Sequence, residues 1–171
     1  MKKGNFTFFW NGIYSQWFPC EFTDPKIPDI VFNCAEQYMM YQKALLMKDN
    51  DTAKKILETK HPKDQKALGR QIKNFDGKLW DKYKEFIVYR GNQLKFTQNP
   101  YLLEQLKLTN PTILVEASPY DRIWGIGLAE DDSRAMMEAQ WLGLNLLGKA
   151  LTNLRNNLLK HEAEIDGTRK N

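Results

Sequence analysis

Residues 33–48, NCAEQYMMYQKALLMK, constrain the fold more than any other stretch, because they predict a helix that is apolar on nearly every side. Such a helix is expected to be buried by other elements rather than to lie on a surface. Glu36 and Lys43 nevertheless fall on one face, within about 20° of each other in helical projection. Their backbones are separated by roughly 10 Å, but the Lys43 side chain leans toward the helix N-terminus. The two charged ends are therefore predicted to line one small cavity.

Two interpretations of these charges follow from the sequence, because charged groups on a buried face are costly unless they are paired or serve chemistry. In the structural interpretation, Asn33 caps the helix, Glu36 is the acid of a capping box, and Lys43 extends to a nearby surface. In the chemical interpretation, Glu36 and Lys43 belong to a reaction site.

Composition indicates one ordinary globular domain, predicted over residues 1–165, followed by a frayed tail over 166–171. The chain has 171 residues, of which 42% are hydrophobic and 27% are charged. No apolar run approaches the roughly 20 residues that span a bilayer, and the N-terminus has no secretory signal pattern. We therefore expect a cytoplasmic protein without a membrane partner.

Two cysteines, Cys20 and Cys34, are too few for a disulfide framework and form no zinc-ligand pattern with the two histidines. The sequence thus predicts no structural metal. The net charge of +4 makes attraction for phosphates plausible, but it is lower than that of a dedicated nucleic-acid binder.

Cap signals, prolines and apolar periodicity predict the secondary structure. Two β-type runs, 6–10 and 30–32, are expected to form a small hairpin with turn signals at 23–29, and 112–117 is the clearest strand. The predicted helices are 36–48, 51–60, 62–72, 77–96, 100–109 and 145–160. The predicted fold class is therefore α+β, predominantly helical, with a few short strands.

The stretch LWDKYKEF, residues 79–86, interleaves aromatic and basic side chains, as nucleic-acid-binding surfaces do. Helical spacing, however, predicts that these aromatic side chains pack inside. This prediction argues against a third possibility, a basic helical nucleic-acid binder without catalytic chemistry.

The segment YDRIWGIGL, residues 120–128, places an acid, an indole and two glycines directly after the predicted strand. A carboxylate can bind ribose hydroxyls, an indole can stack on a base, and backbone amides at a glycine-rich turn can receive phosphate oxygens. The GIG sequence is not the dinucleotide fingerprint, because the third glycine and the βαβ context are missing.

Taken together, seven motifs resemble the YbiA-like, or NADAR, family in the family's order. The resemblance covers residues 8–160. The motifs are SQWFP..F, AEQYMMYQKAL, ALGR, LWD, KFTQNP, LVEASPYDRIWGIGL and WLGLNLLGKALTNLR.

The resemblance implies a YbiA-like fold and an enzyme that cleaves N-glycosidic bonds to ribose. Two substrate classes are associated with the family: ADP-ribose attached to guanine in nucleic acid, and a ribosylamino-pyrimidine phosphate of the riboflavin pathway. No cofactor or metal is implied. The matching positions are Glu36, Lys43 and Asp121 as catalytic residues, with Trp80, Trp124, Gly125, Gly127, Asn145 and Arg70 as substrate-binding residues.

For three of these residues the sequence also predicts a structural role. Arg70 could bind a phosphate or cap helix carbonyls, Trp80 could stack on a ligand or pack in the core, and Asn145 could cap the last helix.

The implied mechanism is attack by a desolvated Lys43 amine on the anomeric carbon, with Glu36 moving protons. A rival mechanism uses Glu36 and Asp121 as paired carboxylates, one protonating the base and the other activating water. A non-catalytic ADP-ribose or nucleotide-binding module is the alternative function.

Three departures from the family pattern leave the substrate open. Gln16 and Trp17 stand where SNF is common, Gln37 stands where a histidine is common, and Leu144 stands where a basic residue is common.

Overall fold

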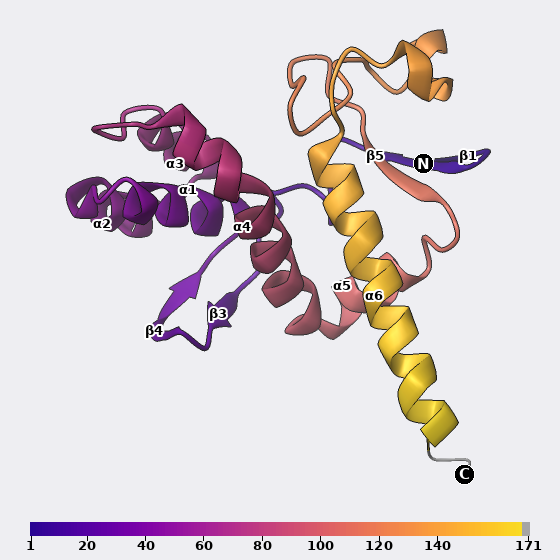
Figure 1. Cartoon of the computed structure of the whole chain (residues 1–171), viewed down its shortest axis with the longest axis horizontal. Helices are drawn as coiled ribbons and strands as arrows, with labels where there is room; N and C mark the ends of the chain where they lie inside the picture. The colour runs from indigo at the N-terminus through magenta and orange to yellow at the C-terminus, as the bar shows by residue number, and fades with distance from the viewer. Residues whose placement is uncertain (169–171) are drawn as a thin grey trace. The chain divides into compact units, whose positions relative to one another are not determined.

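The computed structural model describes residues 1–168, which fall into two compact units. One unit comprises Ser15–Pro100, and the other combines Met1–Tyr14 with the chain from Tyr101 onward. Figure 1 traces both units along the chain. A single domain over 1–165 stays a prediction, and each unit is described separately below.

The Ser15–Pro100 unit is a helical cluster around α1, with a β-hairpin at its edge (Figure 1). Three other helices pack directly on α1. The elements are β3 Phe22–Asp24, β4 Ile27–Phe32, α1 Ala35–Leu46, α2 Asn50–Glu58, α3 Pro62–Gly69 and α4 Gly77–Thr97.

Helix α1 is buried on most sides, as its sequence predicted, since every residue from Ala35 to Tyr41 is buried. The predicted cap is wrong by one residue. Cys34 is the N-cap, and its sulfur accepts a hydrogen bond from the Gln37 amide at 3.4 Å. Gln37 therefore occupies the third helical position that the capping box had given to Glu36. The Asn33 side chain instead donates to the Lys60 carbonyl.

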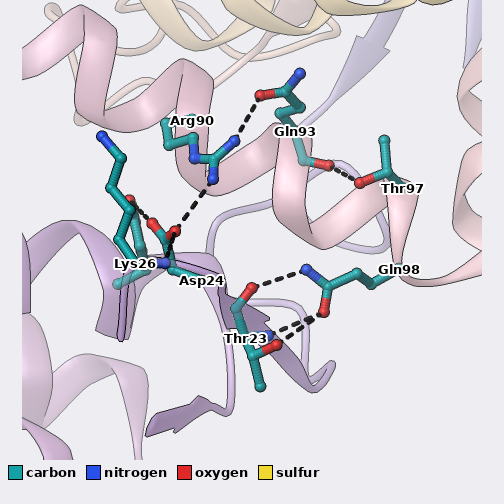
Figure 2. A network of polar contacts seen from close by, with 8 residues as sticks. Thr23, Asp24, Lys26, Arg90, Gln93, Thr97 and Gln98 are labelled. Carbon is teal, nitrogen blue, oxygen red and sulfur yellow. Dashed lines mark hydrogen bonds and ion pairs between the residues drawn. The ribbon is translucent and has the colours of Figure 1, made fainter. Parts of the chain in front are cut away.

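The β3–β4 hairpin is fastened to α4 by a polar network (Figure 2). The Arg90 guanidinium donates to Asp24 at 3.1 Å and to Gln93 at 3.2 Å. The Gln98 amide group bonds the backbone of Thr23 in both directions, at 2.8 and 3.0 Å. These contacts hold the second half of α4 against the hairpin.

The other unit is built on a short three-stranded sheet and a long C-terminal helix. The sheet order is β1–β2–β5, with β1 antiparallel to β2 and β2 parallel to β5. Helix α6 packs along β5 (Figure 1). The elements are β1 Lys2–Lys3, β2 Phe6–Phe9, α5 Pro100–Lys107, β5 Ile113–Glu116, the 3₁₀ helices η1 Ser133–Met136 and η2 Glu138–Gln140, and α6 Leu146–Thr168.

The predominantly helical α+β class is confirmed, with two corrections of detail. The hairpin forms from Phe22–Asp24 and Ile27–Phe32, while Phe6–Phe9 pairs with distant β5, a parallel pairing that no local signal in the sequence indicates. Residues 166–168 of the predicted frayed tail continue α6, and 169–171 lie outside the described residues. No described helix is both long and apolar enough to cross a membrane.

Candidate functional site

The Lys43 side chain lies among groups from three other segments of the Ser15–Pro100 unit. Its ammonium donates to the Gly69 carbonyl at 2.9 Å. The same nitrogen lies 4.6 Å from the Phe75 ring centroid and 5.5 Å from that of Trp80. Helix α1 thus supplies the amine, the end of α3 an acceptor, and the loop and first turn of α4 two aromatic rings.

The pKa of Lys43 is lowered, mainly because burial disfavours its charged form. The Glu36 carboxylate opposes this shift by attracting the ammonium, and the Arg70 charge adds to it. The two rings also favour the charged amine through cation–π attraction. The neutral form of Lys43 is therefore more accessible than that of a surface lysine.

Glu36 is buried, with only 5% of its surface exposed. It is not a capping-box acid, because the cap of α1 is formed without it. Its backbone amide donates to the Gln16 carbonyl at 2.9 Å, which ties the first turn of α1 to the preceding segment. The charge of Glu36 nevertheless acts on Lys43, since it raises the pKa of the amine against the effect of burial.

Gly69 allows α3 to approach α1 closely enough for its carbonyl to meet Lys43. A Cβ at this position would lie 2.0 Å from the Met40 sulfur, so any larger residue would require the Met40 side chain to move. Arg70 follows as the C-cap of α3, and its own amide donates to the Lys66 and Ala67 carbonyls. Its side chain is exposed, so both the capping role and a ligand contact remain compatible with its position.

The Asp121–Gly127 loop is folded by its own polar groups. The Asp121 carboxylate accepts from the Ile123 amide at 2.9 Å and from the Trp124 amide at 2.8 Å. Both Asp121 and Trp124 are partly exposed, which suits residues expected to meet a ligand. Asp121 therefore shapes the loop as well as presenting a carboxylate.

The two loop glycines serve close backbone packing. A Cβ on Gly125 would lie 2.8 Å from the Glu116 carbonyl oxygen, and Gly127 has a φ of +70°. The Gly127 amide donates to the Asp121 carbonyl at 3.1 Å. The expectation that this amide receives a phosphate oxygen is therefore wrong, because an internal acceptor already occupies it.

Asn145 has a structural role in the unit that contains β5. It is fully buried with a φ of +53°, a conformation that asparagine tolerates. Its side chain accepts from the Glu116 amide and donates to the Leu114 carbonyl, both at 3.0 Å. Asn145 thus joins the start of α6 to β5, and both ends of its amide group are engaged.

The structure collects the predicted residues into two groups, one in each unit. Glu36, Lys43, Arg70 and Trp80 belong to the first, and Asp121, Trp124, Gly125, Gly127 and Asn145 to the second. Phe75 was missed, because nothing in a loop sequence indicates which side chain will cover a distant lysine. The exposed side chains of Trp10 and Tyr120 were missed for the same reason. Their ring centroids lie 5.9 Å apart, and Tyr120 directly precedes Asp121 in the sequence.

The prediction for residues 79–86 is wrong for two of its three aromatic side chains. Tyr83 is 37% exposed and Phe86 is 64% exposed, while Trp80 is partly buried. The buried residues of α4 begin only at Ile87, so its first ten residues pack less closely than the apolar spacing suggested.

Comparisons with known proteins match nearly the whole chain. A family model described as the NADAR domain matches residues 8–159. The chain is 46% identical over 147 residues to N-glycosidase R617 of Acanthamoeba polyphaga mimivirus, covering 84% of this chain and 85% of that protein. It is 32% identical over 113 residues to the chloroplastic riboflavin biosynthesis protein PYRR of Arabidopsis thaliana, covering 64% of this chain but only 17% of that protein.

The fold has a solved counterpart. The NMR structure of the Escherichia coli protein YbiA matches with a TM-score of 0.76 at 23% identity, covering 96% of this chain and 90% of that one. This likeness confirms the YbiA-like fold. Because the family model spans most of the chain and includes both groups of predicted site residues, the chain belongs to the NADAR domain family.

Proposed function

We propose that this protein is a hydrolase that cleaves the N-glycosidic bond between ribose and a base. The observation that carries the proposal is the environment of Lys43, a partly buried amine with a lowered pKa, coupled to the buried acid Glu36 on the same helix. The similarity to a protein named N-glycosidase over 84% of the chain supports the same reaction class.

In the proposed mechanism the neutral Lys43 amine attacks the anomeric carbon of the ribose. The bond from that carbon to the base breaks, and the base leaves with a proton carried by Glu36. Loss of a proton from the lysine nitrogen and protonation of the ring oxygen then open the sugar to a Schiff base. Water adds to this Schiff base, which releases the sugar and restores the free amine.

Three of the other predicted residues contact the substrate in this proposal. Trp80 walls the site beside Lys43, and the Asp121 carboxylate holds ribose hydroxyls. Trp124 stacks on the base. In the rival mechanism Asp121 and Glu36 act as paired carboxylates and Lys43 forms no covalent bond.

The proposed substrates are ADP-ribose on guanine in nucleic acid and a ribosylamino-pyrimidine phosphate. The similarity to a riboflavin biosynthesis protein favours testing the second beside the first. The assay incubates the protein with each compound and measures release of the free base and the free sugar over time. Binding of either compound without release of base would favour a non-catalytic nucleotide-binding module.

Borohydride reduction during turnover tests the covalent step. A reduced adduct of sugar mass on Lys43 is expected, and Lys43→Arg should lower activity by about 1,000-fold or more. Lys48→Arg, at an exposed lysine just beyond the same helix, is the matched control and should keep both adduct and activity. If Lys43→Arg still turns over substrate without forming an adduct, the covalent mechanism is refuted and the paired-carboxylate mechanism remains.

A further inference from the structure

The first half of α4 presents an exposed stripe of basic and aromatic side chains. Lys78, Lys82 and Phe86 are spaced four residues apart, so they lie along one side of the helix, with Tyr83 beside them. All four are exposed, and the Lys82 ammonium lies 5.4 Å from the Tyr83 ring centroid. These four residues are called the α4 stripe below.

The helix face that carries the α4 stripe is not covered by the unit to which it belongs. None of residues 77–86 is buried. Among the described residues, neither Lys78 nor Lys82 has an ion-pair partner, whereas Lys84 is paired with Asp81 at 2.6 Å. The stripe thus offers two ammonium groups and two aromatic faces to a ligand.

The charge of the chain is concentrated around this helix. Residues 15–100 contain fifteen Lys and Arg against eleven Asp and Glu, which accounts for the whole net charge of +4. Residues 60–86 contain eight basic and four acidic residues. An anionic ligand is therefore attracted to α3, the loop after it and the start of α4.

We infer that the α4 stripe binds single-stranded nucleic acid. Lysines that neutralise phosphates, together with aromatic side chains that stack on bases, are the means by which proteins hold single strands without sequence preference. Around α4, Trp80 lies about 160° from Lys78 and Lys82 but only about 60° from Tyr83. Because Trp80 faces Lys43, a strand on the stripe reaches the proposed site by passing around the helix over Tyr83. The inference rests on the proposed function. Of the two proposed substrates, it favours ADP-ribose on guanine in nucleic acid over the free ribosylamino-pyrimidine phosphate.

Binding is measured by fluorescence anisotropy with an unmodified, labelled single strand of about 12 nucleotides. Changing Lys78 and Lys82 together to Gln should weaken binding and reduce the slope of log affinity against log salt by about 1.4, or 0.7 per lost phosphate contact. The control double variant Lys149→Gln with Lys160→Gln removes the same charge from exposed positions of α6. It should leave the slope unchanged.

Stacking is tested separately from charge. Phe86→Ala should weaken binding by at least about fivefold with an unchanged salt slope, since one stacked base contributes about 1–3 kcal/mol. Tyr101→Ala removes another exposed aromatic side chain from a different helix and should have no effect. If Phe86→Ala matches this control, or if the lysine pair matches its own, the inference is overturned.

Two further measurements separate this inference from the proposed function. The Lys78 and Lys82 double variant should lose kcat/KM on a modified oligonucleotide but keep it on a free nucleotide substrate. If the protein binds the strand but releases no sugar from any substrate, the proposed N-glycosidase function is refuted, while binding of nucleic acid by the α4 stripe is supported. Binding to phosphatidylserine vesicles with none to the oligonucleotide would instead overturn nucleic acid as the ligand.

Discussion

At the scale of single residues, the chemistry depends on how far the surroundings of Lys43 favour its neutral amine. Burial lowers its pKa, the Glu36 carboxylate raises it, and the Arg70 charge lowers it. Of these three influences, the Arg70 charge is the one carried by an exposed side chain, so it can be removed without opening the core. Removing the Arg70 charge is therefore a direct way to change the pKa of the proposed nucleophile, Lys43.

Arg70→Gln should raise the pKa of Lys43, because the repulsion between the two cations disappears. A smaller fraction of the amine is then neutral at any pH below that pKa, so the acidic limb of the pH–rate profile should move to higher pH. NMR titration of the Lys43 amine gives the same shift without any substrate. Arg70→Lys keeps the charge and serves as the control, and a profile that is identical in both variants would contradict the coupling.

At the scale of elements, the β3–β4 hairpin depends on one buried acid. Burial by itself would raise the pKa of Asp24, but hydrogen bonds from the Lys26 amide, Arg90 and the Tyr38 hydroxyl lower it overall. The carboxylate therefore links the hairpin to both α1 and α4, while the rest of the hairpin contributes few buried side chains.

Asp24→Asn should lower the free energy of unfolding by about 2 kcal/mol at pH 7, because hydrogen bonds to a charged group are lost. Since the folded pKa of Asp24 lies below its unfolded value, this advantage is fully present above about pH 4. It disappears as the pH falls through the folded pKa. Urea denaturation of both proteins over this range measures it. Asp29→Asn, at an exposed position of the same hairpin, should cost nothing measurable.

At the scale of the whole molecule, cooperative unfolding must solvate the fully buried amine of Lys95. This side chain donates to the Ser15 carbonyl at 2.8 Å and lies 5.1 Å from the Phe96 ring centroid. Burial lowers the pKa of Lys95 to about 8, and charge coupling to Cys20 and Cys34 opposes the shift. The native protein therefore releases this proton at a lower pH than the unfolded chain does.

The free energy of unfolding of the wild type minus that of Lys95→Met should rise by about 3 kcal/mol between pH 8 and 10.5. In that window the unfolded chain holds a proton that the folded chain has lost, so the free energy of unfolding increases with pH. Subtracting the variant removes the titration of the other lysines. A difference that stays constant with pH would show that Lys95 is not held in a dry interior.

The local elements could be predicted because their signals are short-range. Asp76 caps α4 as expected, with its carboxylate accepting from the Leu79 amide at 3.0 Å, and Pro62 begins α3. The strand at residues 112–117 was visible because its apolar run lies between two prolines. The cap of α1 was missed, because a cysteine sulfur is a weaker acceptor than the neighbouring Asn33 side chain and is seldom chosen as a cap.

The helices, the buried character of α1 and the residues that carry the family's motifs could be predicted from the amino-acid sequence, because periodicity and capping act over a few neighbouring residues. Three features became visible only in the folded chain: the parallel pairing of β2 with β5, the position of Phe75 and Trp80 beside Lys43, and the engagement of Gly127 and Asn145 by backbone groups. These features depend on contacts between segments far apart in the chain, and no local sequence pattern specifies which distant segments come together. The exposed Tyr83 and Phe86 were mispredicted for the same reason, since an apolar stripe is buried only where another element arrives to cover it.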